Sequence, residues 1–135
     1  MRPISASLIA TCSFLLTACG LFDSGTEWRG GPYELTWIDT GENVSISYSL
    51  GDGTAIDRIK PTVFAVGWDG RYLVAKQHPG NDRKVTNYYI IDSKKDGRLR
   101  SPSEVVDGPL SQVEFSRKAA MQGLPEFDKT LTSLE

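Results

Sequence analysis

The two thiols, Cys12 and Cys19, are the strongest nucleophiles in the sequence, and both lie within the first 19 of its 135 residues. Cys19 directly follows Ala18, at the end of a stretch that starts with the basic Arg2 and continues through a mostly apolar run. A positive start, a short apolar centre and a small-residue end are the three parts of a secretory signal peptide. The pattern therefore predicts a signal peptide over residues 1–18.

The residues Leu16-Thr17-Ala18-Cys19 resemble the lipobox of bacterial lipoproteins. The resemblance implies cleavage between Ala18 and Cys19, diacylation of the Cys19 thiol with chains such as palmitate, and attachment to the bilayer of the cell envelope. In Gram-negative lipoproteins an aspartate after the cysteine commonly retains the protein at the inner membrane. Gly20 occupies that position here, which implies the periplasmic face of the outer membrane if the host is Gram-negative.

Two other interpretations of the N-terminal segment stay open. A transmembrane helix needs about 20 predominantly apolar residues, and residues 4–18 are fewer and contain several hydroxyl side chains. An ordinary signal peptide would leave Cys19 without a lipid. We expect the lipid-anchored form.

The cysteine count and the charge limit what the rest of the chain can do. No cysteine follows position 19, which excludes cysteine nucleophiles, disulfides and thiolate zinc sites from the processed chain. The formal net charge is −2, whereas nucleic-acid binding requires a basic surface that neutralises phosphates. We therefore expect no nucleic-acid partner, no metal and no cofactor.

Two patterns in the middle of the chain predict β-structure. Residues 44–50 alternate apolar and serine side chains, which is typical of a half-exposed strand with a serine-lined outer face. Residues 62–68 and 71–77 flank Asp69 and Gly70, and an Asp-Gly pair between β-rich runs predicts a hairpin with a type I′ turn.

Further strands are predicted at residues 33–37 and 85–92. Residues 62–68 and 85–92 are apolar on both faces, so we expect them at the centre of a sheet that is covered on each side. Residues 55–60 carry two isoleucines at helical spacing and predict a short helical turn or an irregular crossover. Together these segments indicate a small antiparallel sheet of about five strands.

A helix is predicted over residues 112–122. Ser111 and Glu114 form a capping-box pattern at its start, and Gly123 is placed to end it. Residues 126–135 have apolar side chains at helical spacing and predict a second, frayed helix.

The fold class expected from these elements is α+β, with the C-terminal capped helix packed on the antiparallel sheet. Residues 1–18 are predicted to be the signal peptide and residues 19–32, which are glycine-rich, the lipidated N-terminus and a flexible tether. Residues 33–135 are predicted to form a single globular domain.

Three motifs occur in order over about residues 60–120: the hairpin at Asp69-Gly70, the strand Tyr88-Tyr89-Ile90-Ile91-Asp92, and the helix start Gly108-Pro109-Leu110-Ser111 with Glu114 and Phe115. This order resembles a family of small bacterial lipoproteins that is classed as a domain of unknown function. The resemblance implies an envelope location and this architecture, and it implies no chemistry. Tyr89 stands where that family has a tryptophan.

No catalytic constellation stands out. His78 is the one histidine and lies beside Pro79 in a predicted loop. A Ser-His-Asp triad would need this histidine, and no Gly-x-Ser-x-Gly elbow surrounds a serine. Carboxylates that are distant in sequence can still meet in a fold, so a hydrolase remains an alternative.

The possible partner-binding residues are Trp68, Tyr72, Tyr88 and His78, since tyrosine and tryptophan are enriched at binding hot spots. The alternative is that these aromatic side chains belong to the core. The sequence thus favours a non-enzymatic protein-binding module of the envelope, such as an inhibitor or immunity protein with an envelope protein as partner. Two alternatives remain: a cell-wall or glycan-acting hydrolase with dispersed carboxylates, and a structural accessory of an envelope assembly complex.

Overall fold

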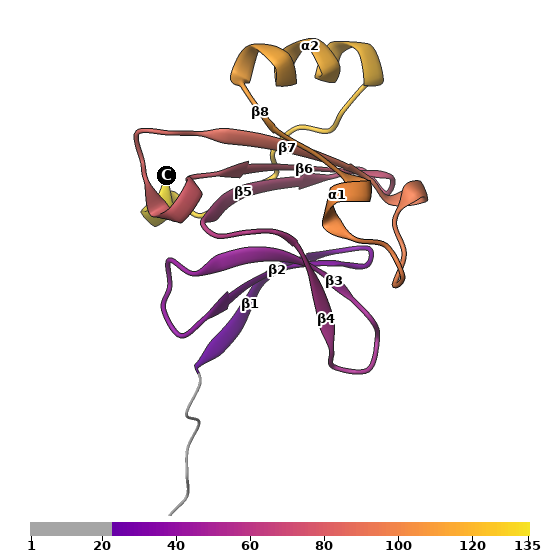
Figure 1. The fold of residues 1–135 in the computed structure, drawn as a ribbon. Coiled ribbons are helices and arrows are strands. Elements are labelled where there is room, and N and C mark those ends of the chain that lie inside the picture. Colours follow the sequence, from indigo (N-terminus) through magenta and orange to yellow (C-terminus); the bar gives the residue numbers. More distant parts are fainter. Residues whose placement is uncertain (1–22) are drawn as a thin grey trace, which may run out of the picture.

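The structure, a computed structural model, describes residues 23–135. The predicted signal peptide, its cleavage site at Ala18 and Cys19, and the lipid attachment at Cys19 lie outside the described residues. The described chain forms three layers: a four-stranded sheet A, a five-stranded sheet B and helix α2 (Figure 1). None of the helices within residues 23–135 is long and apolar enough to cross a membrane.

Sheet A is an antiparallel meander in which consecutive strands are neighbours. Its strands are β1 (Ser24–Gly30), β2 (Tyr33–Ile38), β3 (Val44–Ser49) and β4 (Ala55–Ile59). Alternate apolar residues of β2 and β3 point at sheet B and are fully buried, among them Leu35 and Ile46.

Strand β1 shows that the tether prediction is wrong for residues 24–30. The glycines in this segment are covered by indole rings: a Cβ added at Gly25 would collide with Trp37, and one at Gly30 would collide with Trp28. Because glycine lets a neighbouring group approach the backbone closely, a glycine-rich sequence forms an edge strand here. Within the described residues, the first strand therefore begins at Ser24.

Strand β4 replaces the predicted helical turn, and a β-bulge explains the misleading pattern. Ile46 of β3 lies opposite Ile59, whereas the next residue, Ser47, lies opposite Asp57. Arg58 is thus an extra residue in β4, so two isoleucines three positions apart face the same way. A bulge of this kind re-aims a side chain, and Arg58 is 4% exposed.

The serines of β3 are also less exposed than predicted. Ser45 and Ser47 lie on the outer face of sheet A, yet they are only 8% and 6% exposed. Their direct neighbours across the sheet, Thr36 and Glu34 on β2, have longer side chains. The outer face is therefore polar but closely packed at this point.

Sheet B has the strand order β8-β7-β6-β5-β9. Its strands are β5 (Val63–Trp68), β6 (Tyr72–Gln77), β7 (Asn87–Asp92), β8 (Val106–Leu110) and β9 (Lys129–Thr130). The β5–β6 pairing confirms the predicted hairpin. The type I′ turn is wrong, because that turn needs positive φ at both central residues and Gly70 is the one residue of this turn that has it.

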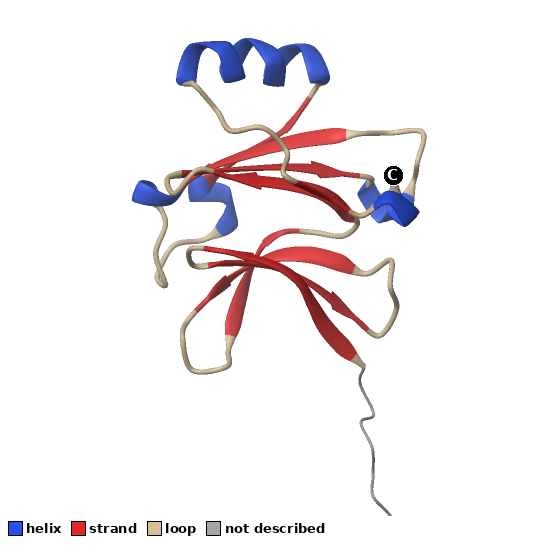
Figure 2. Ribbon diagram, turned by 180° about the vertical axis from the view of Figure 1, so that it is seen from behind, coloured by secondary structure: helices blue, strands red, loops and turns tan. Residues whose placement is uncertain are grey.

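Sheet B contributes to two cores, as its doubly apolar strands predict. One face packs against sheet A in a large inter-sheet core, and the other packs against α2 in a smaller core, with α2 on the far side of sheet B from sheet A (Figure 2). The smaller core contains Val74, Tyr88, Ile90, Leu110 and Phe115.

Helix α2 (Gln112–Gln122) confirms the predicted helix. The Ser111 Oγ accepts a hydrogen bond from the Glu114 N–H, the Glu114 carboxylate accepts one from the Ser111 N–H, and Gly123 ends the helix in the left-handed conformation. Phe115 is its one buried residue. The architecture is thus mainly β with a small helical part, which agrees with α+β at that level, but the sheet of about five strands is replaced by two sheets.

Shorter elements complete the chain. They are η1 (Pro79–Asn81), η2 (Ser93–Lys95), α1 (Pro102–Val105) and η3 (Thr132–Leu134). The predicted second helix in the tail is wrong: the tail forms β9, which pairs with β5, followed by a single 3-10 turn. The C-terminal end is tied to the η1 region, where Arg83 donates a 2.9 Å hydrogen bond to the Ser133 carbonyl.

Candidate functional site

A groove of about 520 Å³ lies where one end of sheet B meets α1 and the last turn of α2. Its apolar lining comes from Tyr72 of β6, Ile90 of β7, and Val105 and Val106 at the junction of α1 and β8. The polar lining consists of Arg71, Asp92, Lys95, Glu104, Asp107 and Gln122. The groove thus combines apolar and polar lining, and it is more polar than the usual small-molecule site, which is mostly apolar.

An ion pair between Arg71 and Asp92 forms one wall of the groove. The Arg71 Nε and Nη2 atoms donate to the two Asp92 carboxylate oxygens at 3.2 and 3.1 Å. The guanidinium also lies 4.8 Å from the ring centre of Tyr72, so it is held by a cation–π contact as well. The hydrogen bonds from Arg71 hold the pKa of the Asp92 carboxyl below its usual value. Asp92 is therefore an ionised acceptor at neutral pH.

The other two carboxylates of the groove also have partners. Glu104 accepts a 2.8 Å hydrogen bond from the Ser101 N–H, which lowers the pKa of Glu104. Asp107 accepts a 2.6 Å hydrogen bond from the Lys118 ammonium. A glycosidase needs one carboxylic acid with a raised pKa, and the pKa values of Asp92 and Glu104 shift in the opposite direction. Neither Asp92 nor Glu104 therefore has the raised pKa of such an acid.

Of the four residues that the sequence singles out for partner binding, Tyr72 lines the groove. Trp68 is half-buried, and its ring packs edge-on against Tyr33 with the ring centres 5.5 Å apart. Tyr88 is 9% exposed and stacks on Phe115 of α2 at 4.9 Å. Trp68 and Tyr88 therefore contribute to the two cores and not to the groove.

His78 also lies away from the groove. It is 4% exposed, and its ring stacks on Phe64 with the centres 4.2 Å apart. The Nδ1 atom lies 2.8 Å from the Val85 carbonyl oxygen and is within hydrogen-bonding distance of it. In this conformation His78 joins the loop after β6 to the chain that leads into β7. Among residues 23–135, no group of three or more histidine, cysteine, aspartate or glutamate side chains is arranged to hold a metal ion.

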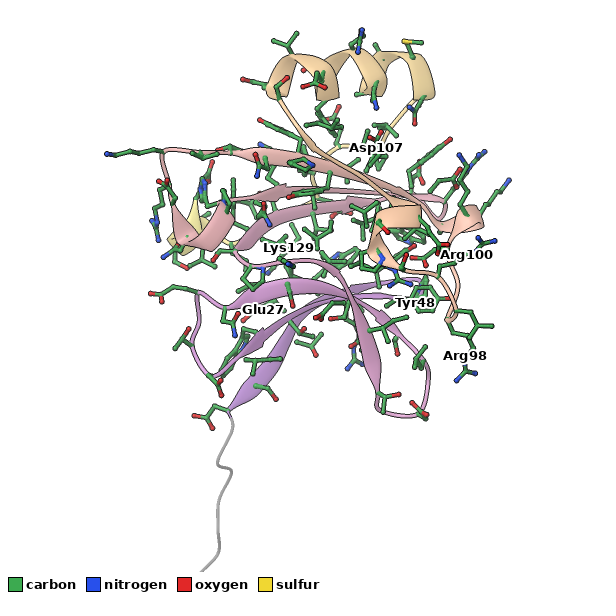
Figure 3. The ribbon with its side chains drawn as sticks, in the orientation of Figure 1. Glu27, Tyr48, Arg98, Arg100, Asp107 and Lys129 are labelled. Carbon is green, nitrogen blue, oxygen red and sulfur yellow. The ribbon has the colours of Figure 1, made fainter. Side chains whose placement is uncertain are left out.

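Beside the groove lies a segment of residues 93–101, which we name the basic loop. It contains four basic residues, Lys94, Lys95, Arg98 and Arg100, and one acidic residue, Asp96. Lys95 also lines the groove. Arg98 and Arg100 extend away from the body of the molecule (Figure 3).

The base of the basic loop is held by a buried network. Arg58 of β4 donates to Asp96 through Nη2 at 2.8 Å and Nε at 3.0 Å, and the two side chains are 1% and 0% exposed. The Arg58 Nη2 also donates to the carbonyl oxygens of Gly97 and Arg100. The Tyr33 hydroxyl donates to Asp96 at 2.9 Å, and burial together with this hydrogen bond raises the pKa of Tyr33. The network fixes both sides of the loop to sheet A.

Sequence reasoning missed most of the groove. One available signal was the Ser101-Pro102-Ser103-Glu104 segment, which has the capping-box spacing and a proline at the first helical position, and which starts α1. The pairing of β6 with β7 places Tyr72 opposite Asp92, and no local sequence pattern predicts that pairing.

Comparison with known protein families shows which family the chain belongs to. A family model described as a protein of unknown function (DUF3997) matches residues 30–134. The chain belongs to this family. No curated protein and no solved structure matches the chain. The DUF3997 match spans β2 to η3, so every residue that lines the groove lies inside the family region.

Proposed function

We propose that the protein is a lipid-anchored binding module of the bacterial cell envelope that recognises another envelope protein through the groove. An inhibitor or immunity-type protein is the concrete form of this role. The observation that carries the proposal is the groove itself, with a mixed apolar and polar lining in which Arg71, Asp92, Glu104 and Asp107 are already held in place by partners. Groups that are fixed before binding lose less entropy when a partner docks.

Membrane attachment in this proposal depends on acylation of Cys19. Strand β1 begins at Ser24, five positions after Cys19, and an extended chain spans at most about 3.6 Å per residue. The domain would therefore stay within about 18 Å of its anchor. This short link suits a partner at the same membrane surface, which is the periplasmic face of the outer membrane if the host is Gram-negative, given Gly20.

The anchor is tested by the Cys19→Ser variant. We expect this variant to be released in soluble form by a high-salt wash, because the substituted residue cannot be acylated and salt screens any attraction between exposed charges and the bilayer. The measurement is fractionation of the host membranes with mass spectrometry of the N-terminal peptide of the wild type. An N-terminal peptide without acyl mass, on a protein that stays at the membrane, would contradict the anchor.

The groove is tested by a pair of tryptophan substitutions on α2. Gln122 lines the groove at the last turn and Gln112 lies at the first turn, and both are exposed. We expect Gln122→Trp to weaken capture of a stoichiometric envelope protein at least about 10-fold, because one well-placed side chain at a binding hot spot contributes that much or more. Gln112→Trp should leave capture unchanged. Equal capture by both variants would show that the captured protein does not bind at the groove.

One observation favours the hydrolase alternative: Asp92, Glu104 and Asp107 line the same groove. If the protein cleaves a glycan, Asp107→Asn should abolish release of reducing sugar from cell-wall material while the variant remains folded. If the wild type hydrolyses cell-wall material and this variant does not, the protein is a hydrolase and not a binding module. Absence of hydrolysis together with groove-dependent capture would support the binding module.

A further inference from the structure

The basic loop concentrates positive charge on a chain that is acidic as a whole. The formal net charge of the protein is −2, yet all four basic side chains of the loop, Lys94, Lys95, Arg98 and Arg100, are exposed. They follow one another within seven positions, so they form a single patch. A patch of this kind attracts anions even when the net charge of the protein is negative.

The acidic residues in and next to the loop offset only part of this positive charge. Asp96 is the one acidic residue within the loop; its side chain is 0% exposed and is bound by Arg58 and Tyr33. Asp92 before the loop is paired with Arg71 and also interacts with the charge of Lys95, and Glu104 after the loop interacts with the charge of Arg100. The four cations therefore outnumber the carboxylates near them, and all four are exposed to solvent.

The apolar residue at the tip of the loop is the second observation. Leu99 is 94% exposed and lies between Arg98 and Arg100. An exposed leucine leaves apolar surface in water that burial would stabilise. Aliphatic side chains next to lysine and arginine are typical of segments that lie in the interface of a bilayer, where the apolar part enters the headgroup region and the cations contact anionic lipids.

The network beneath the loop makes it suitable for docking. Arg58 binds Asp96 and also the carbonyl oxygens of Gly97 and Arg100, so the backbone on both sides of Leu99 is held to sheet A. A loop that is ordered beforehand loses little conformational entropy when it binds.

We propose that the basic loop docks on a bilayer surface rich in anionic phospholipid, with Leu99 entering the headgroup region and the four cations contacting lipid phosphates. This surface shares Lys95 with the groove of the proposed function, and it does not require acylation of Cys19. The exposed leucine favours a bilayer over a soluble polyanion, because a polyanion offers the cations phosphates but gives an aliphatic side chain no apolar phase to enter.

The test is co-sedimentation of the full chain, carrying Cys19→Ser throughout, with two kinds of vesicle: phosphatidylglycerol mixed with phosphatidylcholine, and phosphatidylcholine alone. The N-terminal segment is identical in all samples, so differences between variants report the domain. We expect binding to the anionic vesicles to be tighter and to weaken with added salt. Each cation removed from the loop should weaken binding about 5-fold.

The decisive variants form a matched pair. Arg98→Ala with Arg100→Ala removes two charges from the loop, whereas Lys84→Ala with Arg117→Ala removes two exposed charges from other surfaces. The loop variant should weaken binding to the anionic vesicles about 25-fold, and the control should change it far less. Leu99→Ala should weaken binding about 10-fold, because most of the apolar side chain is lost.

Three results would overturn the proposal: equal binding to both kinds of vesicle, equal losses in the two double variants, or an unchanged affinity in Leu99→Ala. The last result, together with displacement of the protein from vesicles by soluble polyphosphate, would assign the loop to a phosphate-rich polymer in place of a bilayer. Circular dichroism of each variant confirms that the domain remains folded.

Discussion

Two arginine–aspartate pairs flank η2, and they lie in opposite environments. Asp92 is the residue before η2 and pairs with Arg71, with side chains 14% and 45% exposed. Asp96 is the residue after η2 and pairs with Arg58, with side chains 0% and 1% exposed. Both arginines bind both carboxylate oxygens, so the chemistry of the two pairs is the same.

The difference in burial decides what each pair does. Breaking a buried pair leaves a charge without water or partner, which costs about 3–5 kcal/mol. An exposed pair contributes about 0–1 kcal/mol, because water solvates both charges when they separate. The Arg58 pair therefore holds the basic loop to sheet A, whereas the Arg71 pair shapes one wall of the groove at little energetic consequence.

The largest loss of stability is expected for Arg58→Met, which removes the cation of the buried pair. We expect it to lower the free energy of unfolding by about 3–5 kcal/mol, since Asp96 would be left as an uncompensated buried charge. Denaturant titration of the variant and the wild type measures this difference. Arg98→Met, at an exposed position of the same loop, is the control and should change the stability by less than about 0.5 kcal/mol.

A double variant tests whether Arg58 and Asp96 act as a pair. Arg58→Met with Asp96→Leu removes both charges and should recover part of the loss, because no charge remains unpaired. Recovery should be incomplete, since the carbonyl oxygens of Asp57, Gly97 and Arg100 lose their donor. A double variant less stable than Arg58→Met would show that the two side chains do not act as a pair.

Tyr33→Phe tests the third member of the buried network. Tyr33 is fully buried and its hydroxyl donates to Asp96. Removing a hydrogen bond to a charged group costs about 1.5–3 kcal/mol, and Asp96 keeps its bonds to Arg58, so the effect should fall below that of Arg58→Met. Tyr48→Phe serves as the control, and a larger loss there than at Tyr33 would contradict the assignment.

Arg71→Ala tests the exposed pair. We expect a loss of no more than about 1 kcal/mol in the free energy of unfolding. The loss should shrink further at high salt, which screens exposed charges. A loss of about 3 kcal/mol or more, unaffected by salt, would remove the distinction between the two pairs.

The smallest expected effect is the acid dependence of the Arg71 contribution. The pKa of the Asp92 carboxyl is lower in the folded state than in the unfolded chain, mainly through its hydrogen bonds with Arg71. Its stabilising contribution is therefore present above the unfolded pKa, near about 4, and is lost as the pH falls through the folded pKa. The stability difference between wild type and Arg71→Ala, measured from pH 7 down to pH 3, should decline below about pH 4. If the stability difference between wild type and Arg71→Ala grew on acidification, the pKa of Asp92 would not be lowered in the folded state.

Sequence reasoning was successful where the signal is local. The Asp69-Gly70 hairpin and the α2 helix follow from residues next to one another, and the structure has both. The doubly apolar strands also predicted a central sheet with a cover on each face, because burial on both sides leaves a pattern that can be read without knowing the partners.

The failures share a physical cause, which is dependence on residues far apart in sequence. The bulge at Arg58 gives a strand the spacing of a helix, and it serves a contact with Asp96, 38 positions away. Strand β1 is glycine-rich because indole rings cover its backbone, and one of those rings comes from Trp37 on the neighbouring strand. The groove was missed for the same reason, since β6, β7, α1 and α2 each supply only a few of its residues.

The tryptophans all pack against one of the two cores, so tryptophan emission reports on that core alone. All three, Trp28, Trp37 and Trp68, lie in the described part of the chain and pack against the inter-sheet core, and the smaller core beneath α2 contains none of them. Indole emission therefore follows the separation of the two sheets, whereas the helical circular dichroism signal follows α2. Since α2 is held through one buried side chain, a transition midpoint that comes earlier by circular dichroism than by emission would reveal the helix leaving an intact sandwich.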